Sequence, residues 1–227
     1  GLLAAFSFLT FPAHVLECHY ARPDVIQVGF ASVALACAAV VATRHSSRPW
    51  VWSLAGGVAA GLAIATMVWG MLALVPLATA VLVGEWRGAL DRRYLTRVAV
   101  VGCATSAATA IGYLLGSVET FVFWDTFREG RERAAAMHGS SRYHLPTTLL
   151  GHTALLAFGA LATAFAYGGA FLTVARRVPS ARWIVVTTLA AGAALLGMLD
   201  GDMLRYVLFL SPVIAVLAGG TLDEALA

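Results

Sequence analysis

Side chains that could do chemistry gather in one short segment, ECHYARPD (residues 17–24), which separates two apolar stretches. Asp24 offers a carboxylate that can serve as an acid, a base or a ligand. Arg22 is placed to position that carboxylate, and His19 and Tyr20 are close neighbours in the sequence. The segment therefore predicts a small polar site, with Asp24 as its catalytic residue and the other three as substrate-binding residues.

The same segment also has a purely structural explanation. Pro23 disfavours helix at Arg22 and suits the first turn of a new helix. Asp24 then falls in the first turn of a predicted helix over 25–43, where free N–H groups and the helix dipole favour a carboxylate. A helix start with interfacial charges thus stays open as the alternative, although ionisable groups at membrane depth often mark function.

A second candidate position lies near the end of the chain, in LDGDMLRYVLFLSPVIAVLAGG (residues 199–220). Arg205 and Tyr206 open the last predicted span. A guanidinium is always charged and can bind two oxygens, so Arg205 could meet a lipid phosphate at headgroup level. The structural alternative is a snorkelling arginine beside an aromatic anchor. Pro212 is predicted to lie in mid-span and to kink it.

The largest polar segment is the loop at about 116–147. It is longer than a connection requires, which favours a substrate-binding loop with Asp125 and Arg128 as contacts. The alternative is an interfacial connector, with a surface helix over 125–137 supported by opposite charges four residues apart. An aromatic belt accompanies it: Phe121, Phe123, Trp124 and Phe127. No metal site is predicted, because His138 and His144 match no helical metal pair.

Composition defines the elements that must position these residues. The chain has 227 residues, a mean hydropathy of +0.82 and 12% charged residues, against about 25% in a soluble domain. This predicts an integral membrane protein. Cys18, Cys37 and Cys103 lack metal-ligand spacing, and the last two are predicted to be small packing residues inside apolar runs. The net charge of +3 does not suggest a nucleic-acid partner.

The predicted fold class is all-α, a polytopic transmembrane helix bundle of about eight spans. Because the chain opens at Gly1, already inside an apolar run, residues 1–227 are expected to be a partial transmembrane domain of a longer protein. The predicted spans are 1–17, 25–43, 51–66, 69–84, 98–115, 148–175, 183–199 and 204–220.

Residues 51–84 are too long for one span, so a break is predicted at TMVWG (Thr66 to Gly70), which could form part of a cavity floor. Before it, Gly57 and Gly61 form a small-xxx-small pair that predicts close helix packing.

The charges predict an orientation. Loops 43–49, 85–97 and 175–182 hold nine of the fifteen basic residues, all arginines, but only two acids. The other loops hold six arginines and eight acids. The arginine bias places the first set in the cytoplasm. The opening turn, the long loop and the segment before Arg205 then all lie on the non-cytoplasmic face.

Three stretches together resemble the class C (GT-C fold) membrane glycosyltransferases, in particular bacterial relatives of protein O-mannosyltransferases and of the aminoarabinose lipid A transferase. The first is HYARPDVIQVGFASVALACAAVVATR, similar to the outer turn and helix that carry the family's second acid. The second is WSLAGGVAAGLAIATMVWGMLALVPLATAVL, similar to its Gly-rich helix, tight outer turn and following helix. The third is LRYVLFLSPVIAVLAGG, similar to its Arg-Tyr followed by Pro.

The resemblance implies sugar transfer from a polyprenyl-phosphate-linked donor to a protein or glycolipid acceptor, at the outer face of the plasma membrane. It implies that Asp24 matches the second, supporting acid and that Arg205 meets the donor phosphate. The principal acid would lie before the matched region. Many relatives have a lysine after the Thr of the tight turn, where this chain has Met67, which leaves the donor type open. No cofactor is predicted, with a divalent cation left open.

Two other function classes remain as alternatives. A transporter or lipid flippase should carry ionisable or broken-helix residues near the bilayer midplane, whereas the polar groups here gather at the outer helix ends. The second alternative is a membrane scaffold without catalytic activity. The sequence contains no P-loop, no Gly-rich dinucleotide fingerprint and no Ser/His/Asp order.

Overall fold

The computed structural model describes residues 23–43, 48–66, 68–85, 90–118, 122–125, 128–129, 132, 158, 160–175, 181–196 and 210–226. Over these residues the chain is all-helical, with seven α-helices and one 3-10 helix, η1, of defined bounds. They are α3 (Pro23–Thr43), α4 (Pro49–Thr66), η1 (Val68–Ala73), α5 (Leu74–Glu85), α6 (Arg92–Gly116), α11 (Ala160–Ala175), α12 (Ala181–Leu196) and α13 (Ser211–Leu226). The all-helical prediction is confirmed.

Three of these helices are long and apolar enough to cross a membrane. The segments are Val25–Thr43, Pro49–Thr66 and Arg92–Gly116, with mean hydropathies of 2.3, 1.3 and 1.8. Helix is the expected form for such segments, because hydrocarbon offers no partners to backbone N–H and C=O groups and a helix satisfies them internally. The described helices α5, α11, α12 and α13 contain shorter apolar segments.

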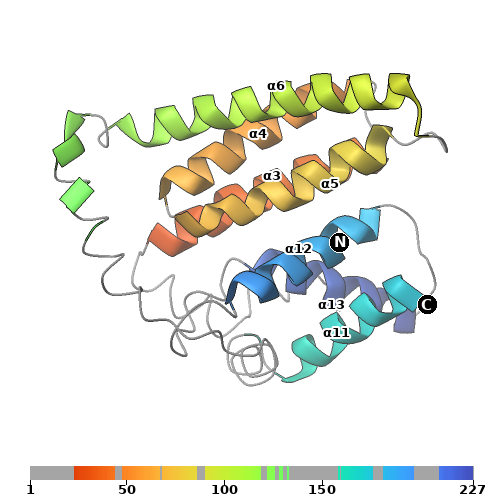
Figure 1. The fold of residues 1–227 in the computed structure, drawn as a ribbon. Coiled ribbons are helices and arrows are strands. Elements are labelled where there is room, and N and C mark those ends of the chain that lie inside the picture. The colour runs from red at the N-terminus through yellow and green to blue at the C-terminus, as the bar shows by residue number, and fades with distance from the viewer. Residues whose placement is uncertain are drawn as a thin grey trace.

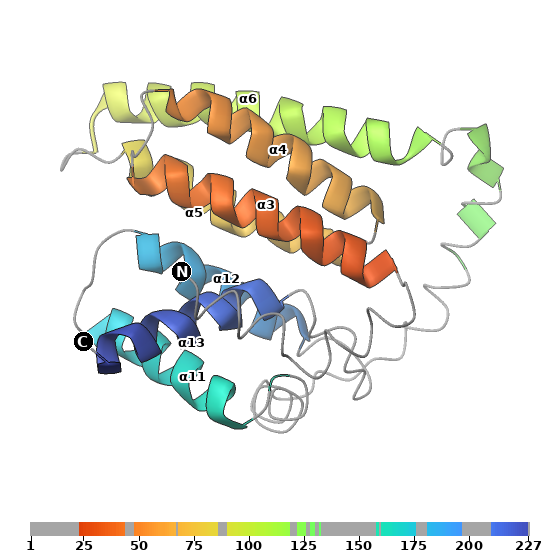
Figure 2. The ribbon, with the colours of Figure 1, turned by 180° about the vertical axis from the view of Figure 1, so that it is seen from behind.

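The helices form two groups that meet along one seam. Figures 1 and 2 show α6 at one edge of the molecule, α4 beneath it, and α3 and α5 together below α4. The helices α11, α12 and α13 form the second group on the far side of α3 and α5. The main contact between the groups is that of α12 with α5, with smaller contacts of α12 and α13 with α3.

Glycines let α4 approach α6 closely. A Cβ built on Gly57 would lie 2.7 Å from the Thr105 carbonyl oxygen, and one on Gly61 would lie 2.5 Å from the Tyr113 nitrogen. Such positions accept no side chain, so the two backbones meet directly, as in small-xxx-small helix pairs. The predicted packing role of Gly57 and Gly61 is confirmed.

The predicted break between two antiparallel segments is also confirmed. Helix α4 ends at Thr66, and the six-residue η1 leads into α5. Gly70 in η1 packs so tightly against the α4 backbone at Ala63 that a Cβ there would overlap it. Pro76 lies in the first turn of α5, where a missing N–H is tolerated.

The starts of α5 and α6 differ from the sequence prediction. Helix α5 begins at Leu74 rather than 69, because the 3-10 helix η1 precedes it. Helix α6 begins at Arg92, six residues before the predicted 98, because the Asp91 carboxylate accepts a 2.6 Å hydrogen bond from the Tyr94 N–H and caps the helix. Helix α13 is Ser211–Leu226, with Pro212 as its second residue. Residues 204–209 of the predicted last span lie outside the described residues, so the kink at Pro212 stays a prediction.

The prediction for the cysteines holds in one case and fails in another. Cys37 is buried in the core between α3 and its neighbours. Cys103 is exposed, because α6 has an outward face that no described helix covers. Hydropathy alone cannot separate a lipid-facing position from a packed one, which is why both residues looked alike in the sequence. Cys18 lies outside the described residues.

One polar contact crosses the seam in the middle of the helices. The Thr79 and Thr187 hydroxyl oxygens, from α5 and α12, are 3.1 Å apart. Thr187 also lies 2.8 Å from the Trp183 carbonyl oxygen of its own helix. A hydroxyl bonded to its own helix can therefore also join two helices in an apolar surrounding.

We expect this Thr79–Thr187 contact to contribute about 0.6 kcal/mol, the average for interhelical hydrogen bonds in membranes. A double-mutant cycle with Thr79→Val and Thr187→Val, read by denaturant unfolding in detergent, measures it. A coupling energy of zero would contradict the contact.

Candidate functional site

The structure describes three of the eight residues that the sequence predicts for the site. Asp24 lies in α3, and Asp125 and Arg128 follow α6. The other five lie outside the described residues: His19, Tyr20, Arg22, Arg205 and Tyr206. Whether those residues meet Asp24 therefore stays a prediction.

Asp24 is the second residue of α3, directly after Pro23. This confirms the prediction that it lies in the first turn of a helix. The unpaired N–H groups of that turn and the helix dipole favour a negative charge there. The same helix carries Gln27, Ala31 and Leu35 at successive turns after Asp24.

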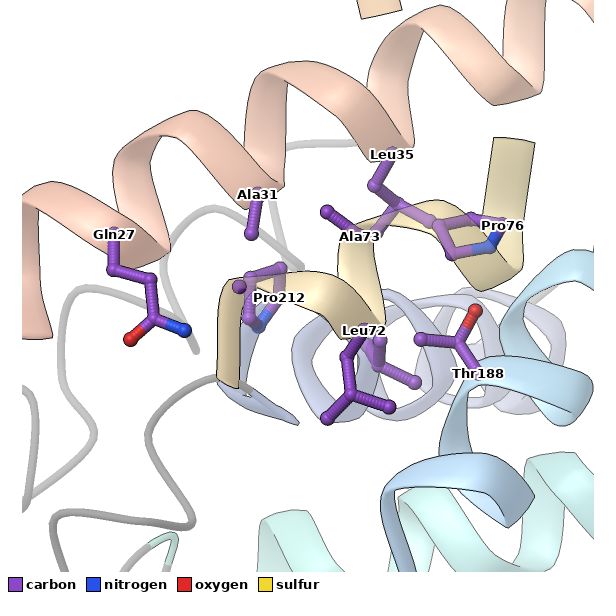
Figure 3. A pocket seen from close by; sticks show the side chains of 10 residues that line it. Gln27, Ala31, Leu35, Leu72, Ala73, Pro76, Thr188 and Pro212 are labelled. Atoms are coloured by element: carbon purple, nitrogen blue, oxygen red, sulfur yellow. The ribbon is translucent and has the colours of Figure 1, made fainter. Parts of the chain in front are cut away.

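A small cavity opens at the seam one turn below Asp24. Figure 3 shows it between α3, η1, α5, α12 and α13. Its volume is about 20 Å³. The lining residues are Gln27, Ala31, Leu35, Gly70, Leu72, Ala73, Pro76, Thr188, Pro212 and Val213. Of the predicted break at Thr66 to Gly70, Gly70 lines this cavity, together with Leu72 and Ala73 of η1.

Gln27 is the polar residue that sequence reasoning missed. Its side chain is 2% exposed, and its buried Nε2 atom has no hydrogen-bond partner in the part of the chain that the structure describes. Leaving a buried donor unsatisfied costs about 1–3 kcal/mol. A signal was present in the sequence: Gln27 is an amide within an otherwise apolar run and lies three residues after Asp24, on the same side of the helix.

The Thr188 side chain faces the cavity from α12 (Figure 3). Its hydroxyl donates a 2.6 Å hydrogen bond to the Ile184 carbonyl of its own helix. The hydroxyl oxygen keeps a lone pair that can accept a further hydrogen bond. The cavity thus has a free donor at Gln27 and an acceptor at Thr188, within mostly apolar walls.

The structure does not bring Asp125 and Arg128 to this cavity. Both residues are exposed, and neither is among the residues that line it. Arg128 Nε lies 3.8 Å from Glu132 Oε1, the predicted pair at four-residue spacing. Such an exposed pair contributes little to stability. Phe123 and Trp124 are 62% and 51% exposed, which fits the interfacial aromatic belt, whereas Phe121 and Phe127 lie outside the described residues.

A larger groove runs between α5 and α6. Its volume is about 300 Å³, and it is lined by aliphatic side chains of both helices together with Gly102, Thr105, Ser106 and Thr109. The Thr105 and Thr109 hydroxyls each donate to a carbonyl of their own helix, at 2.8 and 2.9 Å. The groove therefore presents an apolar surface that suits a hydrocarbon chain.

No group of three His, Cys, Asp or Glu side chains that could hold a metal ion occurs among the described residues. His138, His144 and His152 lie outside them. The described part of the site thus offers an acid at a helix start, an amide in a small cavity and an apolar groove.

No protein-family model, curated protein or solved structure matches this chain. The functional argument therefore rests on the chain's own residues and on their places in the fold.

The predicted orientation can be checked at two exposed residues, Arg48 before α4 and Asp125 after α6. In a background with the three native cysteines replaced, we expect Asp125→Cys to react with a membrane-impermeant maleimide in intact cells. Arg48→Cys should react only after permeabilisation, because arginine-rich loops stay in the cytoplasm. The reverse pattern would contradict the outer placement of Asp24.

Proposed function

We propose that this chain is a multi-pass protein of the plasma membrane that transfers a sugar from a polyprenyl-phosphate-linked donor to a protein or glycolipid acceptor. The reaction takes place on the non-cytoplasmic face. Asp24 orients the acceptor or a second catalytic carboxylate, and Arg205 meets the donor phosphate. Membrane lipids surround the protein, and the donor approaches the site sideways from the bilayer.

The observation that carries this proposal is the position of Asp24. It lies in the first turn of α3, at the end of the bundle that the arginine distribution assigns to the outer face. An acceptor hydroxyl needs a nearby base to remove its proton. A leaving lipid phosphate needs positive charge, and arginine supplies it with two parallel hydrogen bonds.

The groove between α5 and α6 supports a lipid-linked substrate. Helix α6 has an apolar composition, and only 17% of its most apolar 18-residue segment is buried inside the protein. Its outward face therefore meets the bilayer. An isoprenoid chain can lie against such walls while its phosphate stays at headgroup level. Binding of an isoprenoid chain would explain why an apolar groove lies beside α6, a helix that is largely uncovered by the other helices.

The test is an assay of the full-length protein in proteoliposomes with a panel of polyprenyl-phosphate sugars. We expect sugar release or transfer from at least one donor. Vesicles with heat-inactivated protein are the control. An absence of release from every donor would count against the enzyme and would shift the proposal to the transporter below.

A transporter or lipid flippase is the second candidate, and one observation favours it. The 3-10 helix η1 interrupts the α-helical structure between the apolar helices α4 and α5, and it lines the small cavity beside the buried Gln27 amide. Transporters use such interruptions to bind their substrates. A flux assay on the same vesicles distinguishes the two, because a transporter moves its substrate without cleaving the sugar–phosphate bond.

A further inference from the structure

The Gln27 side chain has a hydrogen-bond donor without a direct acceptor. The residue is only 2% exposed, and its buried Nε2 has no hydrogen-bond partner among the described residues. In a membrane-spanning bundle a polar group in this situation pairs with another helix, with a backbone carbonyl or with water. Figure 3 shows the side chain leaving α3 on the side of Pro212 and η1, toward the cavity.

The cavity has the size of one water molecule. Its volume of about 20 Å³ exceeds the roughly 10–15 Å³ that a single water needs. A sugar ring or a lipid chain does not fit such a volume. A water molecule also needs two to four polar partners to stay in a buried site, so the walls must supply acceptors as well as the Gln27 donor.

The walls do offer acceptors. Pro76 has no backbone N–H, so it cannot bond to the Leu72 carbonyl four residues earlier, as a regular helix would require. Leu72 belongs to η1, whose 3-10 geometry makes poorer hydrogen bonds than an α-helix. The Thr188 hydroxyl oxygen adds a lone pair from α12. All three residues line the cavity.

We propose that this seam cavity binds one internal water molecule, which accepts a hydrogen bond from Gln27 Nε2 and donates to the Leu72 carbonyl and the Thr188 hydroxyl. The water joins α3 and η1 of the first helix group to α12 of the second. It is a structural ligand of the bundle, and the assignment does not depend on which reaction the protein catalyses.

The decisive experiment is a structure of the full-length protein in lipid, at a resolution that shows ordered water. The expected result is density at hydrogen-bond distance, about 2.7–3.2 Å, from the Gln27 amide. An empty cavity, a hydrocarbon chain or a protein side chain in contact with Nε2 would each overturn the proposal.

A second measurement keeps the proposal testable in solution. Bound water can be detected by X-ray radiolysis in ¹⁸O water, which labels side chains beside it. Labelling of Leu72 and Pro76 should be several-fold above that of Val28, which is buried away from the cavity. Gln27→Met, of similar length without a polar group, should reduce it to the Val28 level.

Ser32→Ala is the matched control for that variant. Ser32 lies on the same helix, and its hydroxyl bonds to the Val28 carbonyl at 2.7 Å rather than lining the cavity. Its removal should leave the labelling of Leu72 and Pro76 unchanged. Labelling at the Val28 level in the wild type, or full labelling in Gln27→Met, would overturn the water site.

Discussion

Asp24→Asn in the full-length protein is expected to abolish sugar transfer while membrane insertion stays intact. The change removes a carboxylate from the first turn of α3 and leaves the size of the side chain nearly unchanged. If the carboxylate takes or orients a proton during transfer, the rate should fall by about 10²–10⁴-fold, the usual contribution of general acid–base catalysis. Release of sugar from the donor, measured in proteoliposomes with wild type and variant side by side, checks this.

Asp91→Asn is the matched control for that experiment. Asp91 caps α6 at the end of the bundle that is predicted to be cytoplasmic. Asn caps helices about as well as Asp, so this variant should keep both stability and transfer. Equal transfer by wild type and Asp24→Asn would disprove the catalytic role of Asp24. A loss with Asp91→Asn as well would indicate a general effect of removing charge.

Gly61→Ala is expected to destabilise the bundle more than an ordinary surface change in a helix. The added Cβ would overlap the Thr109 carbonyl oxygen and lie 2.5 Å from the Tyr113 nitrogen of α6. Both atoms belong to the backbone, so no side-chain rotation can relieve the overlap and the two helices must separate. Overpacking of this kind costs about 1–3 kcal/mol, and sometimes more. Thermal unfolding in detergent measures the effect.

Gly102→Ala is the matched control for this second change, since it adds the same methyl group to α6. Apart from the neighbouring residues and backbone of α6 itself, no atom of the described residues lies within 4 Å of a Cβ built on Gly102. Because Ala favours helix over Gly by about 0.5–1 kcal/mol, this variant should be as stable as the wild type or more stable. If Gly61→Ala unfolded at the same temperature as Gly102→Ala, the close approach of α4 and α6 would be wrong.

The sequence by itself determined the helical class and most helix positions. Long apolar runs interrupted by short polar turns leave no other structure in hydrocarbon, because every backbone group must be bonded within its own segment. The break after Thr66 and the helix start at Pro23 could also be predicted from the sequence. Both depend on local chemistry, on span length and on proline geometry, and both are found in the structure.

The helix starts that failed show where local signals end. The arginines at the beginning of α6 lower the local hydropathy, although the cap at Asp91 extends the helix through them. Helix α5 begins only at Leu74, although the predicted span starts at 69, because the 3-10 helix η1 occupies the residues before it. A hydropathy pattern reports the length of an apolar stretch, and only capping and packing decide where the helix begins.

Tertiary structure alone decided which residues meet at the seam. The cavity combines residues from α3, η1, α5, α12 and α13, which are separated by up to about 190 positions in the chain, as from Gln27 to Val213. The packing of the helices buries the Gln27 donor without a partner among the described residues and leaves Cys103 on an outward face. The physical reason is that lipid and the interior of a helix bundle are equally apolar. The sequence therefore shows that a residue avoids water but not which helix it contacts.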